Sequence, residues 1–117
     1  MPSMFISGRD VAIDTSFFIN GLNADAETIT IRTDDDETFV NFVVDGQRYT
    51  AKWYDWNNSI RITCDDLNYD EYEVADRKLY ELSKRFTDDV FDNLFIKKIV
   101  VWAEGDKPVL LVVLYEK

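Results

Sequence analysis

The sequence predicts a single α+β domain over residues 1–117, in which an antiparallel sheet packs against one long or broken helix. From Thr28 to about residue 64, apolar and polar residues alternate, which is the period of half-buried strands. Between about residues 69 and 95 the apolar spacing changes to three and four, as in a helix. Two apolar runs over about 96–115 flank a turn. We therefore expect a meander, a helix and a C-terminal hairpin, in that order.

The meander has a predicted register. Asp45 and Gly46 fit a two-residue type I′ turn between strands over 38–44 and 47–54. This turn sets two groups of cross-strand pairs, and the more apolar group should face the core. The expected core-facing pairs are Phe42 with Tyr49, Val40 with Ala51, and Thr38 with Trp53; the other face holds Val43 with Arg48, Asn41 with Thr50, and Phe39 with Lys52.

A further strand over 59–64 completes the meander, with Ile60, Ile62 and Cys64 directed inward. The helix that follows carries one apolar stripe, made of Tyr72, Ala75, Leu79, Leu82, Phe86, Val90 and Leu94. Asn68 and Glu71 resemble a capping pair at its start. Thr87, followed by Asp88 and Asp89, could cap a second helix, so we allow a break near residue 87.

The closing hairpin contains a strand that is apolar on both faces, Val109 to Tyr115. This pattern predicts a central strand buried on both sides; the alternative is an edge that another chain covers. The pattern of the first 27 residues indicates their secondary structure less clearly. Short strands over 4–7 and 11–13 and a helical turn over 16–21 are the expectation, and the choice between strands and a helix stays open.

Composition limits the partners. The chain has 13 basic and 23 acidic residues, a net charge of −10. Binding to a phosphate backbone depends on Lys and Arg replacing counterions, so we expect no direct contact with nucleic acid and none with an anionic membrane. A protein partner with a basic surface would be attracted. No stretch approaches the roughly 20 apolar residues that span a bilayer, and we expect a cytoplasmic protein without a cofactor.

Catalysis is restricted by what the chain lacks. It contains no histidine and one cysteine, Cys64. Ser-His-Asp and Cys-His mechanisms are therefore excluded, as are zinc sites made of histidines or thiolates. Because Cys64 alternates inward with Ile60 and Ile62, we interpret it as a packed thiol rather than a nucleophile. We predict that the protein is not an enzyme.

Two short motifs have competing interpretations. Val11 to Ser16, an apolar strand ending in Asp-Thr-Ser before an apolar segment, resembles the opening of a PIN-domain ribonuclease over about ten residues. That resemblance implies a parallel α/β fold with Asp14 near a divalent metal, whereas the following residues predict antiparallel strands. Asp66, Asn68 and Asp70 match the first three ligands of an EF-hand loop, but Glu71 and Arg77 occupy the positions that need Gly and Glu. Helix capping explains them better.

The acidic residues are concentrated in two places, the predicted turn at 34–37 and the predicted strand-to-helix junction at 65–76. An aromatic strand end lies close to them in sequence, and Trp and Tyr are common interface anchors. We therefore predict a partner-binding surface formed by Asp34, Asp35, Asp36, Glu37, Asp65, Asp66, Asp70, Glu71, Glu73, Asp76, Tyr54 and Trp56.

These features favour a small acidic protein-binding module of bacterial or phage type. Immunity proteins and inhibitors of nucleic-acid enzymes, some of which imitate the charge spacing of DNA, share this profile. The alternative is a structural or accessory subunit that forms homo-oligomers through Val109 to Tyr115. A metal-dependent enzyme that uses carboxylates is the third hypothesis.

Overall fold

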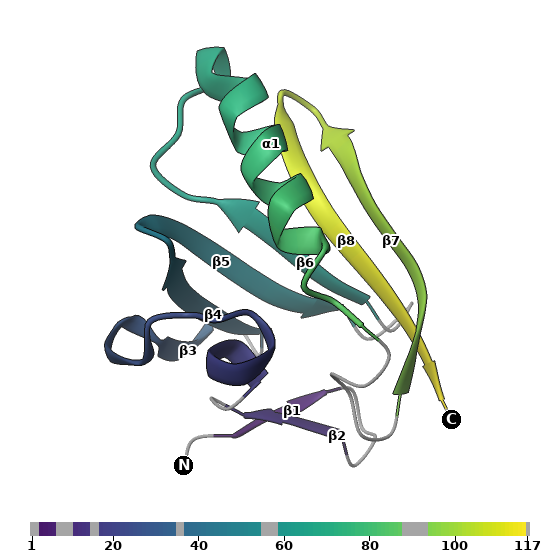
Figure 1. Cartoon of the computed structure of the whole chain (residues 1–117). Coiled ribbons are helices and arrows are strands. Elements are labelled where there is room, and N and C mark those ends of the chain that lie inside the picture. Colours follow the sequence, from purple (N-terminus) through teal and green to yellow (C-terminus); the bar gives the residue numbers. More distant parts are fainter. Residues whose placement is uncertain are drawn as a thin grey trace.

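The computed structural model describes residues 3–6, 11–14, 17–34, 37–54, 59–87 and 94–116. Its elements, drawn in Figure 1, are β1 (Ser3–Ile6), β2 (Val11–Asp14), η1 (Phe17–Gly21), η2 (Ala26–Thr28), β3 (Thr30–Asp34), β4 (Glu37–Val44), β5 (Gln47–Tyr54), β6 (Ser59–Cys64), η4 (Tyr69–Glu71), α1 (Tyr72–Ser83), β7 (Leu94–Glu104) and β8 (Lys107–Glu116).

Six of these strands form one antiparallel sheet in the order β3-β4-β5-β6-β8-β7, and β1 pairs with β2 in a separate hairpin. The helix α1 lies across β6, β8 and β7 on one face of the sheet (Figure 1). The predicted α+β class is therefore confirmed. β8 lies between β6 and β7, so the apolar strand at 109–115 is central, and both of its hydrogen-bonding edges are occupied.

The predicted register of β4 and β5 is confirmed. Val40 pairs with Ala51, Phe42 with Tyr49 and Phe39 with Lys52. Asp45 and Gly46 have φ angles of 50° and 80°, which a type I′ turn requires at both central positions. Val40, Phe42, Tyr49 and Ala51 are all buried, as expected for the core-facing set.

The buried face of the sheet, which we call the inner face, has two covers. Ala75, Leu79 and Leu82 of α1 pack over β6, β8 and β7. Over β4, the cover is the segment 17–28, which supplies Phe18, Leu22 and Ala24; the rings of Phe18 and Phe42 lie 5.1 Å apart. The N-terminal part of the chain is therefore needed to complete the core, and it does so with a helical turn, η1, rather than with another strand of the sheet.

The helix is shorter than predicted. α1 ends at Ser83, residues 84–87 are not helical, and Leu94 and Phe95 belong to β7, so the expectation of helix up to residue 95 is wrong at all of these positions. Phe86 is still buried in the core, which explains why the apolar stripe continues beyond the helix. Val90 and the predicted second helix after Thr87 lie outside the described residues. The meander also begins later, because Thr28 belongs to η2 rather than to β3.

Arg85 connects the end of α1 to the segment 17–28, which covers the inner face over β4. Its guanidinium donates to the carbonyl oxygen of Leu22 at 2.5 Å and to Oδ2 of Asp45 at 3.0 Å. One side chain thus joins the residues after α1, the segment 17–28 and the β4–β5 turn. This holds both covers in one position relative to the sheet.

Candidate functional site

The two acidic clusters predicted from the sequence lie at opposite ends of the sheet. Asp34 pairs with Glu37 where β3 meets β4. Asp65 lies at the other end, where its N–H donates to the carbonyl oxygen of Arg48 at 2.8 Å. Since Arg48 pairs with Val43, six residues of β4 separate the clusters, or roughly 20 Å at the rise of a strand. The described residues of the two clusters therefore lie far apart rather than side by side. Asp35, Asp36 and Trp56 lie outside the described residues.

Three carboxylates of the 65–76 cluster have local structural roles. Asp65 accepts from Oγ1 of Thr50 at 2.8 and 3.0 Å. Asp66 forms an exposed ion pair with Arg48 at 3.3 Å. Glu71 accepts from the backbone N–H of Asn68 at 3.1 Å, which is one of the two hydrogen bonds of the predicted capping pair. The N-cap of α1 is Glu71 itself, and it makes no side-chain cap hydrogen bond. These carboxylates fix the path of the chain between β6 and α1.

The other three carboxylates of this cluster face solvent. Asp70, Glu73 and Asp76 are exposed and make no hydrogen bond or ion pair with any residue that the structure describes. A crevice lined by Asn68, Tyr72 and Asp106 brings the β7–β8 turn beside the start of α1. We call Asp70, Glu73, Asp76 and Asp106 the acidic end.

The opposite face of the sheet, the outer face, carries cations and aromatic rings in alternation. Its row consists of Arg32, Phe39, Lys52, Tyr54, Arg61 and Trp102, from β3 to β7, and we call it the cation–aromatic row. Arg32 lies 4.5 Å from the Phe39 ring centre, and Lys52 lies 5.4 Å from Phe39 and 4.5 Å from Tyr54. Arg61 lies 4.8 Å from Tyr54 and 5.9 Å from Trp102. All of these distances are in the range of cation–π attraction.

The two central cations of the row are largely shielded from water. The side chains of Lys52 and Arg61 are only 20% and 22% exposed, and they pair with Glu37 at 2.9 Å and with Glu104, respectively. Burial lowers the pKa of each side chain. Hydrogen bonds and electrostatic attraction to the paired carboxylate and to Tyr54 together raise it by more, so the net shift is upward. Both side chains therefore remain charged at neutral pH.

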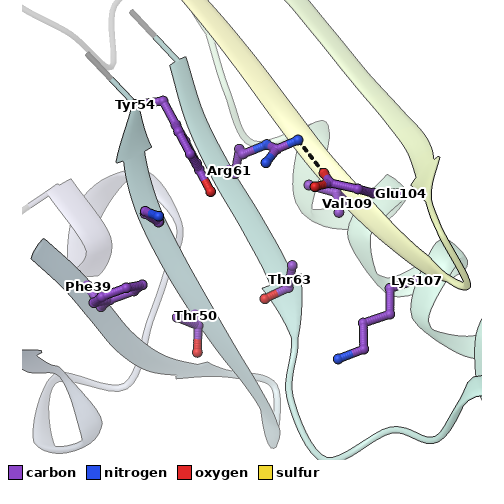
Figure 2. A pocket seen from close by; sticks show the side chains of 9 residues that line it. Phe39, Thr50, Tyr54, Arg61, Thr63, Glu104, Lys107 and Val109 are labelled. Atoms are coloured by element: carbon purple, nitrogen blue, oxygen red, sulfur yellow. Dashed lines mark hydrogen bonds and ion pairs between the residues drawn. The ribbon is translucent and has the colours of Figure 1, made fainter. Parts of the chain in front are cut away.

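A cavity of about 250 Å³ opens on the outer face beside this row (Figure 2). Its lining comprises Phe39, Thr50, Lys52, Tyr54, Arg61, Thr63, Glu104, Lys107 and Val109. Figure 2 shows Arg61 directed to Glu104 of β7 on one side of the cavity, with Thr50 and Thr63 on adjacent strands. The lining combines three cations with one carboxylate, so this face differs in charge from a chain that is acidic as a whole.

The cation–aromatic row was not predicted, although part of its pattern is present in the sequence. The predicted register already placed Phe39 opposite Lys52 and Asn41 opposite Thr50 on this face. A second polar row follows the same strands: Arg32 Nε donates to Asn41 Oδ1 at 3.3 Å, and Asn41 Nδ2 donates to Thr50 Oγ1 at 2.8 Å. Thr50 then donates to Asp65. Of the predicted interface residues, Tyr54 belongs to the row, and Glu37 contacts it through Lys52.

Cys64 is packed on the inner side of the sheet, as predicted. Its thiol lies 3.8 Å from the carbonyl oxygen of Ala75 in α1. Burial raises the pKa of Cys64 to about 12; the Lys78 ammonium opposes this in part, and Asp65 adds a smaller increase. The thiol is therefore protonated at neutral pH and is a poor nucleophile.

Within the described ranges, no three Cys, Asp or Glu side chains gather closely enough to hold a metal ion. No helix of this part of the chain is long and apolar enough to cross a membrane. Comparisons with protein-family models, with curated proteins and with solved structures found no significant match. The features that bear on function are therefore the two charged surfaces of the molecule, the acidic end and the cation–aromatic row.

Proposed function

We propose that this protein is a non-enzymatic protein-binding module that docks its acidic end on a basic surface of a partner. The observation that supports the proposal most directly is the state of Asp70, Glu73 and Asp76, which are exposed and make no ion pair with a described residue. Glu73 and Asp76 are three residues apart on α1, and like charges at this spacing repel one another; cations of a partner would relieve that repulsion. The net charge of −10 would also steer a basic partner toward the molecule.

The class of partner follows from this chemistry. A basic cleft that holds a phosphate backbone presents the kind of surface that spaced carboxylates can occupy. The proposal therefore extends to an inhibitor or immunity-type antagonist, acting in the cytoplasm of a bacterium or a phage-infected cell on a nucleic-acid enzyme. Tyr54 is not part of the proposed surface, because it belongs to the cation–aromatic row at the other end of β5.

Charge-neutral variants provide the test. The variant Glu73→Gln/Asp76→Asn removes two charges from the acidic end, and Glu27→Gln/Glu81→Gln removes two exposed charges elsewhere. Immobilised wild-type protein should capture a basic protein from a lysate of the source cells at about 50 mM NaCl and release it at about 500 mM, where exposed charges are screened. The first variant should retain about fivefold less of that protein, while the second should match the wild type.

Capture that is independent of salt, or equal for both variants, would contradict docking through the acidic end. Recovery of no protein at low salt would contradict it as well. Once a partner is known, duplex DNA added as a competitor distinguishes the two forms of the proposal. Loss of the complex supports occupation of a nucleic-acid cleft, whereas an unchanged complex restricts the proposal to another basic surface.

A further inference from the structure

β7 is an edge strand with unusual length. It spans eleven residues, from Leu94 to Glu104, and no described strand pairs with its second edge (Figure 1). The pairing with β8 shifts between Ile96 and Lys98, so Lys97 is the extra residue of a bulge. From Lys98 to Glu104 the pairing is regular. Long regular edges are sites at which another strand can add to a sheet.

The turn after β7 determines which backbone groups face that free edge. Glu104 pairs with Lys107 across the two-residue turn of Gly105 and Asp106, and such a pair is a hydrogen-bonded one. Because pairs alternate along an antiparallel ladder, Lys98, Val100, Trp102 and Glu104 direct their backbone groups to β8. Ile99, Val101 and Ala103 consequently direct their N–H and C=O groups away from β8, to the free edge.

We infer that a second copy of this chain pairs with this edge, antiparallel, about a two-fold axis through Val101. The regular stretch 98–104 is centred on that residue. In this register Val101 lies opposite its own copy, and Ile99 lies opposite Ala103 of the partner subunit. All three residues with free backbone groups then meet each other in hydrogen-bonded pairs, which gives about six new hydrogen bonds. The interface is isologous, as a two-fold dimer requires.

The side chains favour the same register. Lys98, Val100, Trp102 and Glu104 share the outer face with Val109 and Leu111 of β8, their neighbours in the sheet. Pairing about Val101 puts Lys98 opposite Glu104 of the partner subunit, and Val100 opposite Trp102 of the partner subunit. Each dimer thus gains two pairs of unlike charges and covers two Trp102 side chains, which are 45% exposed in the single chain. A slip by two residues would lose both charge pairs.

The features of β7 that oppose pairing lie outside this stretch. A bulge and exposed lysines are common protections of an edge strand. Here Lys97 and the bulge end the regular pairing at residue 98, while Lys98 itself meets a carboxylate. The pairing continues the sheet from one subunit into the other. It does not involve Asp70, Glu73 or Asp76, so it is independent of the proposed function.

Charge reversal tests the register directly. Dimerisation is measured by sedimentation and light scattering at about 0.15 M NaCl, where repulsion between whole chains is screened beyond about 8 Å. The mass of the wild type should rise from one chain to two with concentration. Lys98→Glu and Glu104→Lys should each weaken dimerisation at least about tenfold, because like charges then lie directly opposite. Lys97→Glu, an equal charge change on the bulge, should leave it unchanged.

Mixing the two single variants is the most specific test of the proposed register. In a mixed dimer of Lys98→Glu with Glu104→Lys, both opposed pairs join unlike charges, so the mixture should dimerise although neither variant does so alone. Since Glu104 also pairs with Arg61, the thermal unfolding of each variant is compared with the wild type to show that the chain remains folded. A mixture that stays monomeric, or equal losses for Lys97→Glu and Lys98→Glu, would overturn the inference.

Amide hydrogen exchange gives an independent measurement on the unmodified protein. The amides of Ile99, Val101 and Ala103 should exchange more slowly as protein concentration rises, while Val100 and Trp102, already bonded to β8, should not change. A wild-type chain that remains a monomer at every concentration, with fast exchange at Val101 throughout, would refute the dimer.

Discussion

The two faces of the six-stranded sheet are built from alternate residues of the same strands, yet they are stabilised differently. On the inner face, Phe42 and its neighbours lose nearly all contact with water under α1 and the segment 17–28. On the outer face, Phe39 is half-buried, and its ring is contacted by Arg32 and Lys52. Burial of apolar area dominates the first face, and cation–π and ion-pair contacts of smaller individual energy dominate the second.

The largest expected effect compares one substitution on both faces of β4. Phe42→Ala should reduce the free energy of unfolding by about 4 kcal/mol, because it leaves a cavity between Phe18 and Tyr49 in the core. Phe39→Ala should cost about 1.5 kcal/mol, since a half-exposed ring loses less area and its cations regain water. Urea denaturation followed by circular dichroism measures both. Equal losses would show that the outer face contributes as much as the core.

A second test uses the burial of Cys64 on the inner side. Its pKa is raised from 9.0 to about 12 in the folded chain, so the unfolded chain loses the thiol proton first as pH rises. The stabilisation is complete below pH 9 and is lost as pH rises toward 12. Between pH 8 and 10 the wild type should lose roughly 1.4 kcal/mol that Cys64→Ala does not lose.

The measurement is the urea midpoint of both chains at pH 8, 9 and 10. The buried Tyr49, whose pKa is raised to about 12 mainly by burial, also destabilises the fold in base, but most of that loss falls above pH 10, because its unfolded pKa is 10.0. Parallel pH profiles for wild type and Cys64→Ala would mean that the thiol is open to solvent.

The smallest effect distinguishes positions within the outer face. Arg61→Met removes contacts with Tyr54, Trp102 and Glu104 and should cost about 1 kcal/mol. Arg48→Met, on the same face, removes an ion pair with Asp66 in which both side chains are more than 60% exposed, and should cost less than about 0.5 kcal/mol. Thermal unfolding of the two variants gives the comparison. A larger loss for Arg48→Met would contradict shielding of the row.

The register of β4 and β5 could be predicted because local residues determine it. Asp45 and Gly46 accept positive φ angles and the flanking residues alternate, so every pair from Phe39 to Val44 follows. The end of the helix could not be predicted in the same way. Leu94 continues the helical stripe of residues 72–86 and equally suits the apolar strand after it, and the choice depends on pairing with Glu116, far along the chain.

The cover over β4 depends on contacts between distant parts of the chain. Phe18, Leu22 and Ala24 show no single period, and they enter the core only because residues 17–28 fold back over Phe42. The candidate site was predicted in part. Acidic residues were expected to gather, but Glu37 and Asp65 lie at opposite ends of the sheet. The predicted register of β4 and β5 indicates only the part of the cation–aromatic row formed by Phe39 and Lys52, because the places of Arg61 and Trp102 depend on how β6, β8 and β7 pair.

The central place of β8 has a consequence for the order of folding during synthesis. β6 ends at residue 64, whereas its neighbour β8 begins only at residue 107, and β7 reaches the sheet only through β8. Until β8 leaves the ribosome, β3 to β6 can form a meander, but α1 has only β6 of its three strands to cover. The nascent chain therefore presents an open edge at β6, to which a chaperone or a second nascent chain has access before β8 is made.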